Sequence, residues 1–471
     1  ANPIYGSSDH TRSAGLVVRL NYAYDNRYLV ELAARYDGSY KFAGMNGSRW
    51  GLFPSASFGW RISNESFFEN ARSVVDDLKI RFSVGEVGAD GSVPAYSFLS
   101  RLGFTGGYPG VIGGSTVNGL YTSSVANPYL TWERSLSYNA GFDAKLWNGK
   151  LGVEFDFFYT YTYDMLTASS GYPPSMGGYY PTYVNDAQEI DTKGVEVTIS
   201  HDNKVGDFRY GVRLNMSWAH TRYLKYPDAI GTPSYQLHAG KSVYSQLALI
   251  AEGLYQSEEE IDNSAWVDGI RPSLGDIKYR DMDGDGVIDA WKDRAFVGRA
   301  NRPAFTAGLN LYAEYKGIDL SMLFTAGAMF DAQLTGVYYN WVMDNTPFTK
   351  IFKDGANAPR YLAENSWTPE NRDAKYPRLS IERANDNNGL TSTYWYRDGK
   401  YLRLKTMQIG YTLPKKWMSH LGIEKLRVYI EGSNLFTWTG LPEGVDPESP
   451  GVNMGYYPQQ RTVMGGVSLT F

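Results

Sequence analysis

Apolar and hydrophilic residues alternate along many stretches of this chain. An alternation of period two places successive side chains on opposite faces of a β-strand. The chain ends in such a stretch, with one face formed by Val463, Gly465, Val467, Leu469 and Phe471 and the other by Met464, Gly466, Ser468 and Thr470. The carboxyl terminus is therefore predicted to be a strand whose two faces meet unlike surroundings.

The same alternation recurs upstream, in stretches 16–24, 28–36, 151–163, 195–199, 210–218 and 309–315. Their second faces carry hydrophilic residues such as Arg19, Glu31, Glu154, Arg213 and Glu314. Strands with one lipid-type face and one hydrophilic face are typical of transmembrane β-barrels. A soluble β-sandwich produces the same alternation, so the strand pattern alone leaves both architectures open.

The lengths of the connections favour the barrel, because bacterial barrels pair short periplasmic turns with long extracellular loops. Short links (25–26, 147–150, 201–206, 316–317, with 63–76 and 412–424 on the same side) alternate with long links (37–52, 88–130, 164–189, 220–302, 328–400, 434–462). If the last strand runs toward the periplasm, every long link is extracellular. We therefore expect a protein of the bacterial outer membrane.

Tracing the strands back gives about 13, or about 15 if the link 220–302 hides a hairpin at 247–251. An odd number with an extracellular start predicts that earlier strands lie elsewhere, because closed single-chain barrels have even numbers. The predicted fold is all-β, a transmembrane antiparallel up-and-down β-barrel. Residues 1–471 are expected to form its carboxyl-terminal part.

Composition agrees with this fold and removes other classes. The chain has 38 Tyr, 12 Trp and 50 Gly, which suits aromatic girdles, tight turns and sugar-contacting loops. It has no Cys, so disulfides do not stabilise it. A net charge of −5 without a Lys/Arg block argues against nucleic acid as a partner. No apolar run reaches about 18 residues, which excludes transmembrane helices.

Several motifs, in order along the chain, resemble the SusC-like TonB-dependent transporters of Bacteroidetes-type outer membranes. One is the run Arg49-Trp50-Gly51-Leu52-Phe53-Pro54-Ser55, and the others lie at 35–39, 59–63, 127–133, 275–279, 397–404 and 432–436. The resemblance implies a barrel of about 22 strands, with an amino-terminal plug and a TonB-box segment. It also implies active import of oligosaccharides or oligopeptides, with the transporter paired to a SusD-like lipoprotein lid and the pair forming a dimer.

Neither a plug nor a TonB box is recognisable in the sequence. We therefore expect the plug and the early strands on another polypeptide or in residues outside this sequence, and contact with TonB through that part. Rival hypotheses are a surface glycan-binding adhesin, a secreted β-sandwich glycan enzyme and a signalling receptor with the same barrel. An importer should require detergent and migrate anomalously on gels unless boiled, whereas a soluble adhesin or enzyme should not.

One local motif predicts a metal site in an extracellular loop. Oxygen ligands at alternate positions, with Gly at the tight turn, are typical of an EF-hand-type loop for calcium, or magnesium. The candidate ligands are Asp281, Asp283, Asp285, Val287 through its carbonyl, Asp289 and Asp293. Lys292 occupies the twelfth position, where a bidentate carboxylate is expected, and Asp293 follows it. The alternative is an acidic turn held by side chain to backbone hydrogen bonds.

Aromatic residues in the long links are the candidates for contact with a ligand or with the lid. They are Tyr179, Tyr180, Tyr183, Tyr338, Tyr339, Trp341, Tyr394, Trp395, Tyr456 and Tyr457. For any single one of them, packing within the loops or an aromatic girdle is the favoured explanation, whereas as a group they are the best ligand candidates. The acidic stretch 258–262 is most simply a solvated loop. With five His and no Gly-x-Ser-x-Gly motif, the sequence contains no catalytic constellation, so we expect no enzyme.

Overall fold

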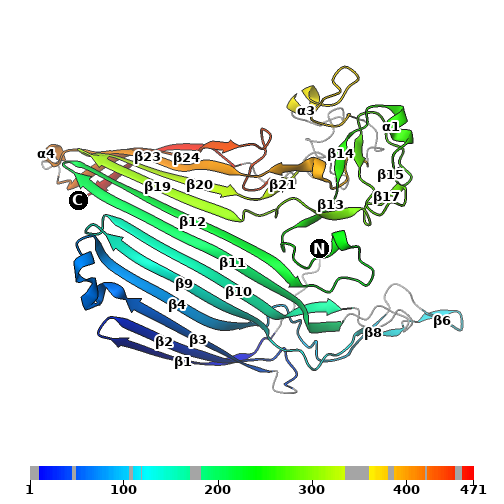
Figure 1. Ribbon diagram of the computed structural model, residues 1–471, viewed down its shortest axis with the longest axis horizontal. Helices are drawn as coiled ribbons and strands as arrows, with labels where there is room; N and C mark the ends of the chain where they lie inside the picture. The colour runs from blue at the N-terminus through cyan, green and yellow to red at the C-terminus, as the bar shows by residue number, and fades with distance from the viewer. Residues whose placement is uncertain are drawn as a thin grey trace. The chain divides into compact units, whose positions relative to one another are not determined.

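The structure is a computed structural model that describes residues 10–44, 49–104, 110–117, 119–169, 182–334, 360–379, 387–418, 422–450 and 459–471. Its main element is a sheet of 13 strands in which each strand pairs with the next main strand in the chain (Figure 1). In order they are β1 (Ser13–Tyr24), β2 (Tyr28–Ser39), β3 (Trp50–Arg61), β4 (Val75–Ala89), β9 (Glu133–Leu146), β10 (Leu151–Ser169), β11 (Thr182–Val205), β12 (Phe208–Lys225), β19 (Phe305–Tyr315), β20 (Ile318–Ala328), β23 (Tyr401–Thr412), β24 (Lys425–Thr439) and β25 (Thr462–Thr470). The predicted all-β, up-and-down order with about 13 strands is confirmed.

The chain divides into two compact units. Unit 1 comprises Ala1–Glu196, His220–Asp228 and His238–Gly240, and unit 2 comprises Val197–Ala219, Ala229–Leu237 and Lys241–Phe471.

The short links are tight turns formed by residues that tolerate a left-handed backbone. In the β1–β2 turn, Asp25 and Asn26 have φ of 50° and 51°. Asn and Asp enter this conformation more readily than other residues with a side chain. In the β9–β10 turn, Trp147 and Asn148 adopt it together with Gly149. These turns fix the register of the hairpins, in which Tyr24 pairs with Tyr28 and Leu146 with Leu151.

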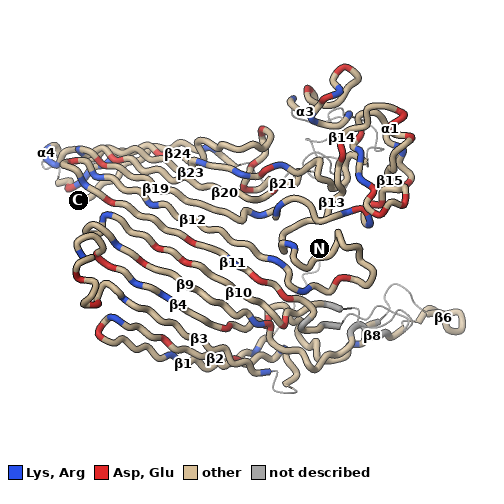
Figure 2. The backbone as a smooth tube through the Cα atoms, in the orientation of Figure 1, with Lys and Arg blue, Asp and Glu red and all other residues tan. Residues whose placement is uncertain are grey.

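The sheet of unit 1 has one apolar face and one hydrophilic face. On the apolar face, Ile80, Phe82 and Phe157 are 44%, 47% and 44% exposed although their strands have neighbours on both sides. No described residue of the unit covers these rows, which suits a face whose solvent is lipid. The hydrophilic face carries ion pairs such as that between Arg81 and Asp143, and charges of both signs follow the strands (Figure 2).

Unit 1 also has a small core beneath its longer links, formed by Phe42, Phe53, Val93, Leu130 and Trp132. Its remaining elements are η2 (Ile62–Asn64) and η3 (Ser66–Ala71) in the β3–β4 link, and β5 (Arg101–Phe104), β6 (Gly110–Ile112), β7 (Ser115–Val117) and β8 (Leu120–Ser124) in the β4–β9 link. β5 pairs with β8, and β6 pairs with β7. The long links therefore carry structure of their own.

Two long links of unit 2 fold together into a small globule that we call the cap, residues 246–297, 331–334, 360–379 and 387–398 (Figure 1). Its strands are β13 (Gln246–Leu249), β14 (Ala251–Leu254), β15 (Trp266–Val267), β16 (Ile277–Tyr279), β17 (Val287–Ile288), β18 (Arg294–Val297), β21 (Asp331–Gln333) and β22 (Tyr396–Asp398). They pair as β13 with β18, β14 with β16, β15 with β17 and β21 with β22. The apolar stretch 247–251 therefore belongs to the cap, and the expectation that it could add two strands to the main sheet is wrong.

The helices of unit 2 are short: η5 (Ser234–Gln236), α1 (Glu258–Asp262), α3 (Arg360–Glu364), η6 (Thr393–Trp395) and α4 (Lys415–Met418). Within the ranges that the structure describes, no helix combines the length and the apolar character needed to cross a bilayer. The cap core contains Leu249, Ile277, Ile288 and Trp395. Leu441, from the link that follows β24, packs in the same core and ties that link to the cap.

Candidate functional site

The acidic loop of the cap brings three predicted metal ligands together. Carboxylate oxygens of Asp281, Asp283 and Asp285 lie within 4.8 Å of one another. Asp281 accepts hydrogen bonds from the backbone N–H groups of Gly284 (2.7 Å) and Gly286 (2.9 Å). Both glycines have positive φ, which lets the chain turn tightly around the carboxylates.

The second half of the loop is closed by Asp293, which is 1% exposed. Its two carboxylate oxygens accept the N–H groups of Met282 and Asp289, each at 2.7 Å. Asp293 therefore acts as a clamp between the two ends of the loop. The Nζ of Lys292, at the twelfth position, lies 3.8 Å from a carboxylate oxygen of Asp285.

Two carboxylates of the loop, Asp281 and Asp289, have lowered pKa values. The backbone N–H groups of Trp291 and Lys292 donate to Asp289 and lower its pKa. For Asp281, burial opposes ionisation, but the N–H groups of Gly286 and Gly284 outweigh it, and its pKa is also lowered. The geometry thus contains both features that the sequence left open, hydrogen bonds within an acidic turn and convergent oxygens of the kind that a hard cation prefers.

Most of the predicted aromatic contacts lie outside the described residues: Tyr179, Tyr180, Tyr338, Tyr339, Trp341, Tyr456 and Tyr457. Tyr183 is part of β11. Trp395 is 1% exposed and donates its indole N–H to the carbonyl of Asn388 at 2.9 Å. Its prediction as a ligand or lid contact is wrong, because its ring forms the cap core. Tyr394 donates its hydroxyl to the carbonyl of Lys375, and burial raises its pKa to about 12.

The sequence motif 275–279 builds the heart of the cap. Gly275 has φ of +82°, and a Cβ atom there would lie 2.4 Å from the ring of Trp367. The buried carboxylate of Asp276 accepts hydrogen bonds from Arg378 at 2.7 Å and from Asn388 at 2.8 Å. The motif therefore specifies packing rather than ligand contact.

Three of the four carboxylates in the acidic stretch of α1 are paired. Arg271 donates to Glu258 at 3.1 Å and to Asp262 at 2.7 Å, and Lys278 donates to Glu260 at 3.1 Å. The stretch expected to be a solvated loop is the short helix α1, with Arg271 pairing at its exposed surface and Lys278 in a half-buried pair.

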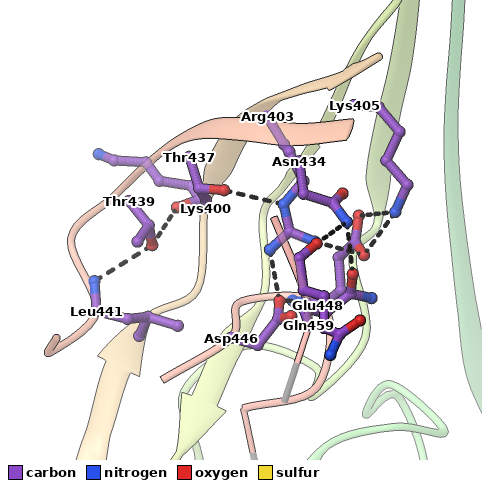
Figure 3. A network of polar contacts seen from close by, with 11 residues as sticks. Lys400, Arg403, Lys405, Asn434, Thr437, Thr439, Leu441, Asp446, Glu448 and Gln459 are labelled. Atoms are coloured by element: carbon purple, nitrogen blue, oxygen red, sulfur yellow. Dashed lines mark hydrogen bonds and ion pairs between the residues drawn. The ribbon is translucent and has the colours of Figure 1, made fainter. Parts of the chain in front are cut away.

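A buried ionic network, which sequence reasoning missed, fastens the link after β24 to the main sheet (Figure 3). Arg403 on β23 is 3% exposed and donates to Asp446 at 2.6 Å and to Thr437 at 3.0 Å. Its Nη1 lies 2.7 Å from Glu448, which also accepts from Lys405. Since Leu441 packs in the cap core, this one link joins cap and sheet.

Three polar contacts on the main sheet reach across a middle strand at a glycine. Arg81 on β4 passes over Gly141 on β9 and pairs with Asp156 on β10 at 2.9 Å. The same arrangement joins Arg427 to Asp319 over Gly410, and Tyr312 to Asp202 over Gly211. A Cβ atom at each of these glycines would come within 3 Å of the bridging side chain or its partner. Because glycine has no Cβ atom, the bridging side chain can cross the middle strand at that position.

Comparison with known proteins gives consistent matches. The family model described as TonB dependent receptor-like, beta-barrel matches residues 1–435. TonB-dependent receptor P3 of Formosa agariphila is 28% identical over 491 residues, which cover 98% of this chain and 46% of that protein. TonB-dependent receptor SusC of Bacteroides thetaiotaomicron is 25% identical over 468 residues, which cover 96% of this chain and 43% of that protein.

Among solved structures, the RagAB peptide importer in its open-open state matches with a TM-score of 0.74 at 22% identity. The match covers 98% of this chain and 47% of the RagAB chain. The chain therefore spans about half the length of the proteins that it matches.

Proposed function

Because the chain belongs to the TonB dependent receptor-like β-barrel family, we propose that it is the carboxyl-terminal barrel portion of an active nutrient importer of the outer membrane. The proposed cargo is an oligosaccharide or an oligopeptide, and the proposed assembly is a SusC/SusD-like complex. The observation that carries the proposal is the 13-stranded antiparallel sheet with an uncovered apolar face and an ion-paired hydrophilic face. The RagAB neighbour is a peptide importer, and SusC is a TonB-dependent receptor.

The two ends of the sheet support a larger barrel. Within the described residues, β1 and β25 each pair with one neighbour, so each has one edge of backbone groups without a strand partner. In a bilayer, each unpaired backbone group costs several kcal/mol, so open edges do not face lipid. We propose that further strands, together with a plug that contacts TonB, close the barrel around this chain. A SusD-like lipoprotein and a second copy of the pair are the remaining proposed partners.

The acidic loop enters the proposal as a stiffening element of the cap. Calcium, or magnesium, bound by Asp281, Asp283 and Asp285 would cross-link the turn without an open catalytic position. The carbonyl of Val287 and the side chain of Asp289 complete the proposed ligand set. Both carboxylate oxygens of Asp293 accept backbone N–H groups, of Met282 and Asp289, so this side chain holds the loop backbone in place.

Membrane extraction and intact mass spectrometry test this function. The importer should partition with outer membranes, require detergent for extraction and change its gel mobility when boiled. Mass spectrometry after denaturation should detect the plug and the early strands, either joined to this chain in a longer polypeptide or as a second polypeptide. A product of 52.7 kDa that is soluble without detergent would refute the proposal and favour an adhesin or a secreted enzyme. Deleting the locus should then stop uptake of the cargo by whole cells while leaving porin-sized solutes unaffected.

A further inference from the structure

A row of apolar side chains crosses one face of unit 2 at the short-turn end of its strands. The pairing register brings them side by side from β12 to β23, and they are Phe208, Tyr315, Ile318 and Tyr411. Their exposed fractions are 41%, 46%, 53% and 39%, respectively. They form the last level of the sheet, because β19 ends at Tyr315 and β20 begins at Ile318.

Polar contacts of the alternate residues show that this row lies on the apolar face. Tyr312 donates to Asp202 at 2.7 Å on the hydrophilic face. On the same face, Arg427 donates to Asp319 at 2.9 Å. Successive side chains of a strand point to opposite faces, so Tyr315, three residues after Tyr312, and the rest of its row face the other way. Further strands would join at the edges of β1 and β25, and a plug would lie against the hydrophilic face, so neither covers this row.

The β19–β20 turn places a cation beside this row. Lys316 and Gly317 have φ of 49° and 88°, so these two residues suffice to reverse the chain. The Nζ atom of Lys316 lies 5.3 Å from the centre of the Tyr315 ring, which belongs to the apolar face. In the part of the chain that the structure describes, no carboxylate pairs with this ammonium group. The turn therefore holds an unpaired positive charge at the boundary of the lipid-facing surface.

The neighbouring link brings two more lysines and a tryptophan to the same level. β23 ends at Thr412, whose N–H donates to the carbonyl of Gly317 at 2.7 Å, so the link begins beside the β19–β20 turn. The helical turn α4 follows, and basic residues are prominent there (Figure 2). Its two lysines are exposed, and its tryptophan is 62% exposed. We call the following residues the turn patch: Tyr315, Lys316, Lys415, Lys416 and Trp417.

The carboxylates near the turn patch leave its charge positive. Asp319 is ion-paired on the hydrophilic face, and Glu314 alternates with the apolar row and so faces that side as well. Asp207, in the adjoining β11–β12 turn, makes no ion pair with Lys316 among the described contacts. Glu424 lies at the far end of the link, where its N–H donates to a carbonyl of β25. The three lysines therefore outnumber the carboxylates at this level of the outer side.

We propose that the turn patch binds phospholipids with a negatively charged headgroup in the periplasmic leaflet, on which the short turns lie in the proposed orientation. The rings of Tyr315 and Trp417 lie at the boundary of headgroups and acyl chains, where amphipathic rings are stable. The lysine ammonium groups pair with the lipid phosphate, and each lysine near a membrane surface strengthens binding to anionic lipid about fivefold. The turn patch continues the lipid-facing row of the sheet, and its charge is complementary to such a headgroup. The proposal depends on the barrel fold and goes beyond the import function.

The test uses the complete polypeptide that carries this chain, purified in detergent and freed of lipid. Phosphatidylglycerol and phosphatidylethanolamine are added separately, and native mass spectrometry gives the affinity for each. The central variant combines Lys316→Gln, Lys415→Gln and Lys416→Gln. Lys316→Gln alone is compared with its matched control Lys425→Gln, which removes a lysine at the same end of the sheet but on the hydrophilic face, two residues before Arg427 on β24.

Wild type should bind phosphatidylglycerol more tightly than phosphatidylethanolamine. Lys316→Gln should weaken the binding of phosphatidylglycerol about fivefold, and the triple variant should lose the preference, while the binding of phosphatidylethanolamine stays unchanged. Lys425→Gln should bind both lipids as wild type does. Replacing all three lysines of the turn patch with Arg should retain the preference, because the positive charge is kept. Gel mobility before and after boiling confirms that each variant has folded.

Each other outcome overturns the proposal in a different way. Equal affinity of wild type for the two lipids would show that the turn patch does not select a charged headgroup. An equal loss in Lys316→Gln and Lys425→Gln would show that the net charge of the protein, and not this patch, sets the affinity. If the triple variant leaves lipid binding unchanged but dissociates a dimer, the turn patch contacts a second copy of the protein instead. None of these measurements involves cargo uptake, so the import proposal is tested separately.

Discussion

Gly141 offers a sharp test of how the inner wall is built. Replacing it with Ala places a Cβ atom 2.4 Å from the carbonyl oxygen of Phe155 and 2.6 Å from a carboxylate oxygen of Asp156. The carbonyl belongs to the paired backbone of β10 and cannot rotate away, so β9 and β10 must separate locally. Asp156 must move as well, which breaks its contact with Arg81.

The magnitude follows from two contributions. Arg81 donates to Asp156 at 3.1 Å and 2.9 Å, and hydrogen bonds to charged groups contribute about 1.5–3 kcal/mol each. Because the two side chains are 30% and 20% exposed, screening reduces the pair to about 1–2 kcal/mol. Overpacking adds about 1–3 kcal/mol. Gly141→Ala should therefore lower the free energy of unfolding by about 2–5 kcal/mol.

Urea unfolding in lipid vesicles, read from the gel shift of the unboiled protein, measures this loss in the complete polypeptide. Asp156→Asn removes the ion pair without the added Cβ and should cost about 1–2 kcal/mol. The double variant should cost less than the sum of the two, because both changes break the same contact. Gly308→Ala is the matched control, since a Cβ atom there meets nothing within 4 Å. Equal losses for Gly141→Ala and Gly308→Ala would refute the reasoning.

Three further predictions address the loops. Calcium should raise the melting temperature of the purified protein, and Asp281→Asn and Asp283→Asn should abolish this rise. Glu259→Gln, on the exposed face of α1, is the control that should preserve it. An equal rise in all variants would show that calcium does not bind in this loop. Arg403→Met leaves the carboxylates of Asp446 and Glu448 without their buried partner, and breaking a buried ion pair lowers the free energy of unfolding by about 3–5 kcal/mol. Amide hydrogen exchange should accelerate in residues 440–450, and unchanged protection there would contradict the network. Hydrogen bonds from Tyr28 and Trp60 lower the pKa of Glu65, so its ionised carboxylate stabilises the β3–β4 link fully above the ordinary carboxyl range, and this stabilisation is lost as the pH falls through the lowered pKa. Limited proteolysis of residues 62–74 at a series of acidic pH values should detect the opening of the link, and Glu65→Gln should remove its pH dependence.

The sequence predicted the main sheet well because each strand carries its own evidence. Stretches such as 16–24 and 309–315 alternate strictly, and Asp25-Asn26 forms a turn whose residue types adopt positive φ. These signals are local, so they predict the strands and turns without knowledge of any distant contact. The same local logic placed Asp281, Asp283 and Asp285 together.

The cap and the wall contacts depended on long-range pairing that spacing does not encode. The apolar stretch 247–251 fits a main-sheet hairpin and a cap strand equally well, and only its partners Tyr279 and Phe296 decide between them. Trp395 resembles a loop aromatic in sequence, yet Asn388 and the cap core bury it. Arg403 meets Asp446 across a separation of 43 residues, and nothing in either neighbourhood indicates the pair.

The contacts that pass over a glycine have a consequence for assembly. Arg81 pairs with Asp143 once β4 and β9 are joined, but its second contact, with Asp156, forms only when β10 arrives beside β9. A slip of β10 by one residue would turn Asp156 to the apolar face and leave Arg81 with Asp143 as its one acidic partner among the described residues. Each such contact therefore adds stability to the sheet only when the next strand pairs in the correct register.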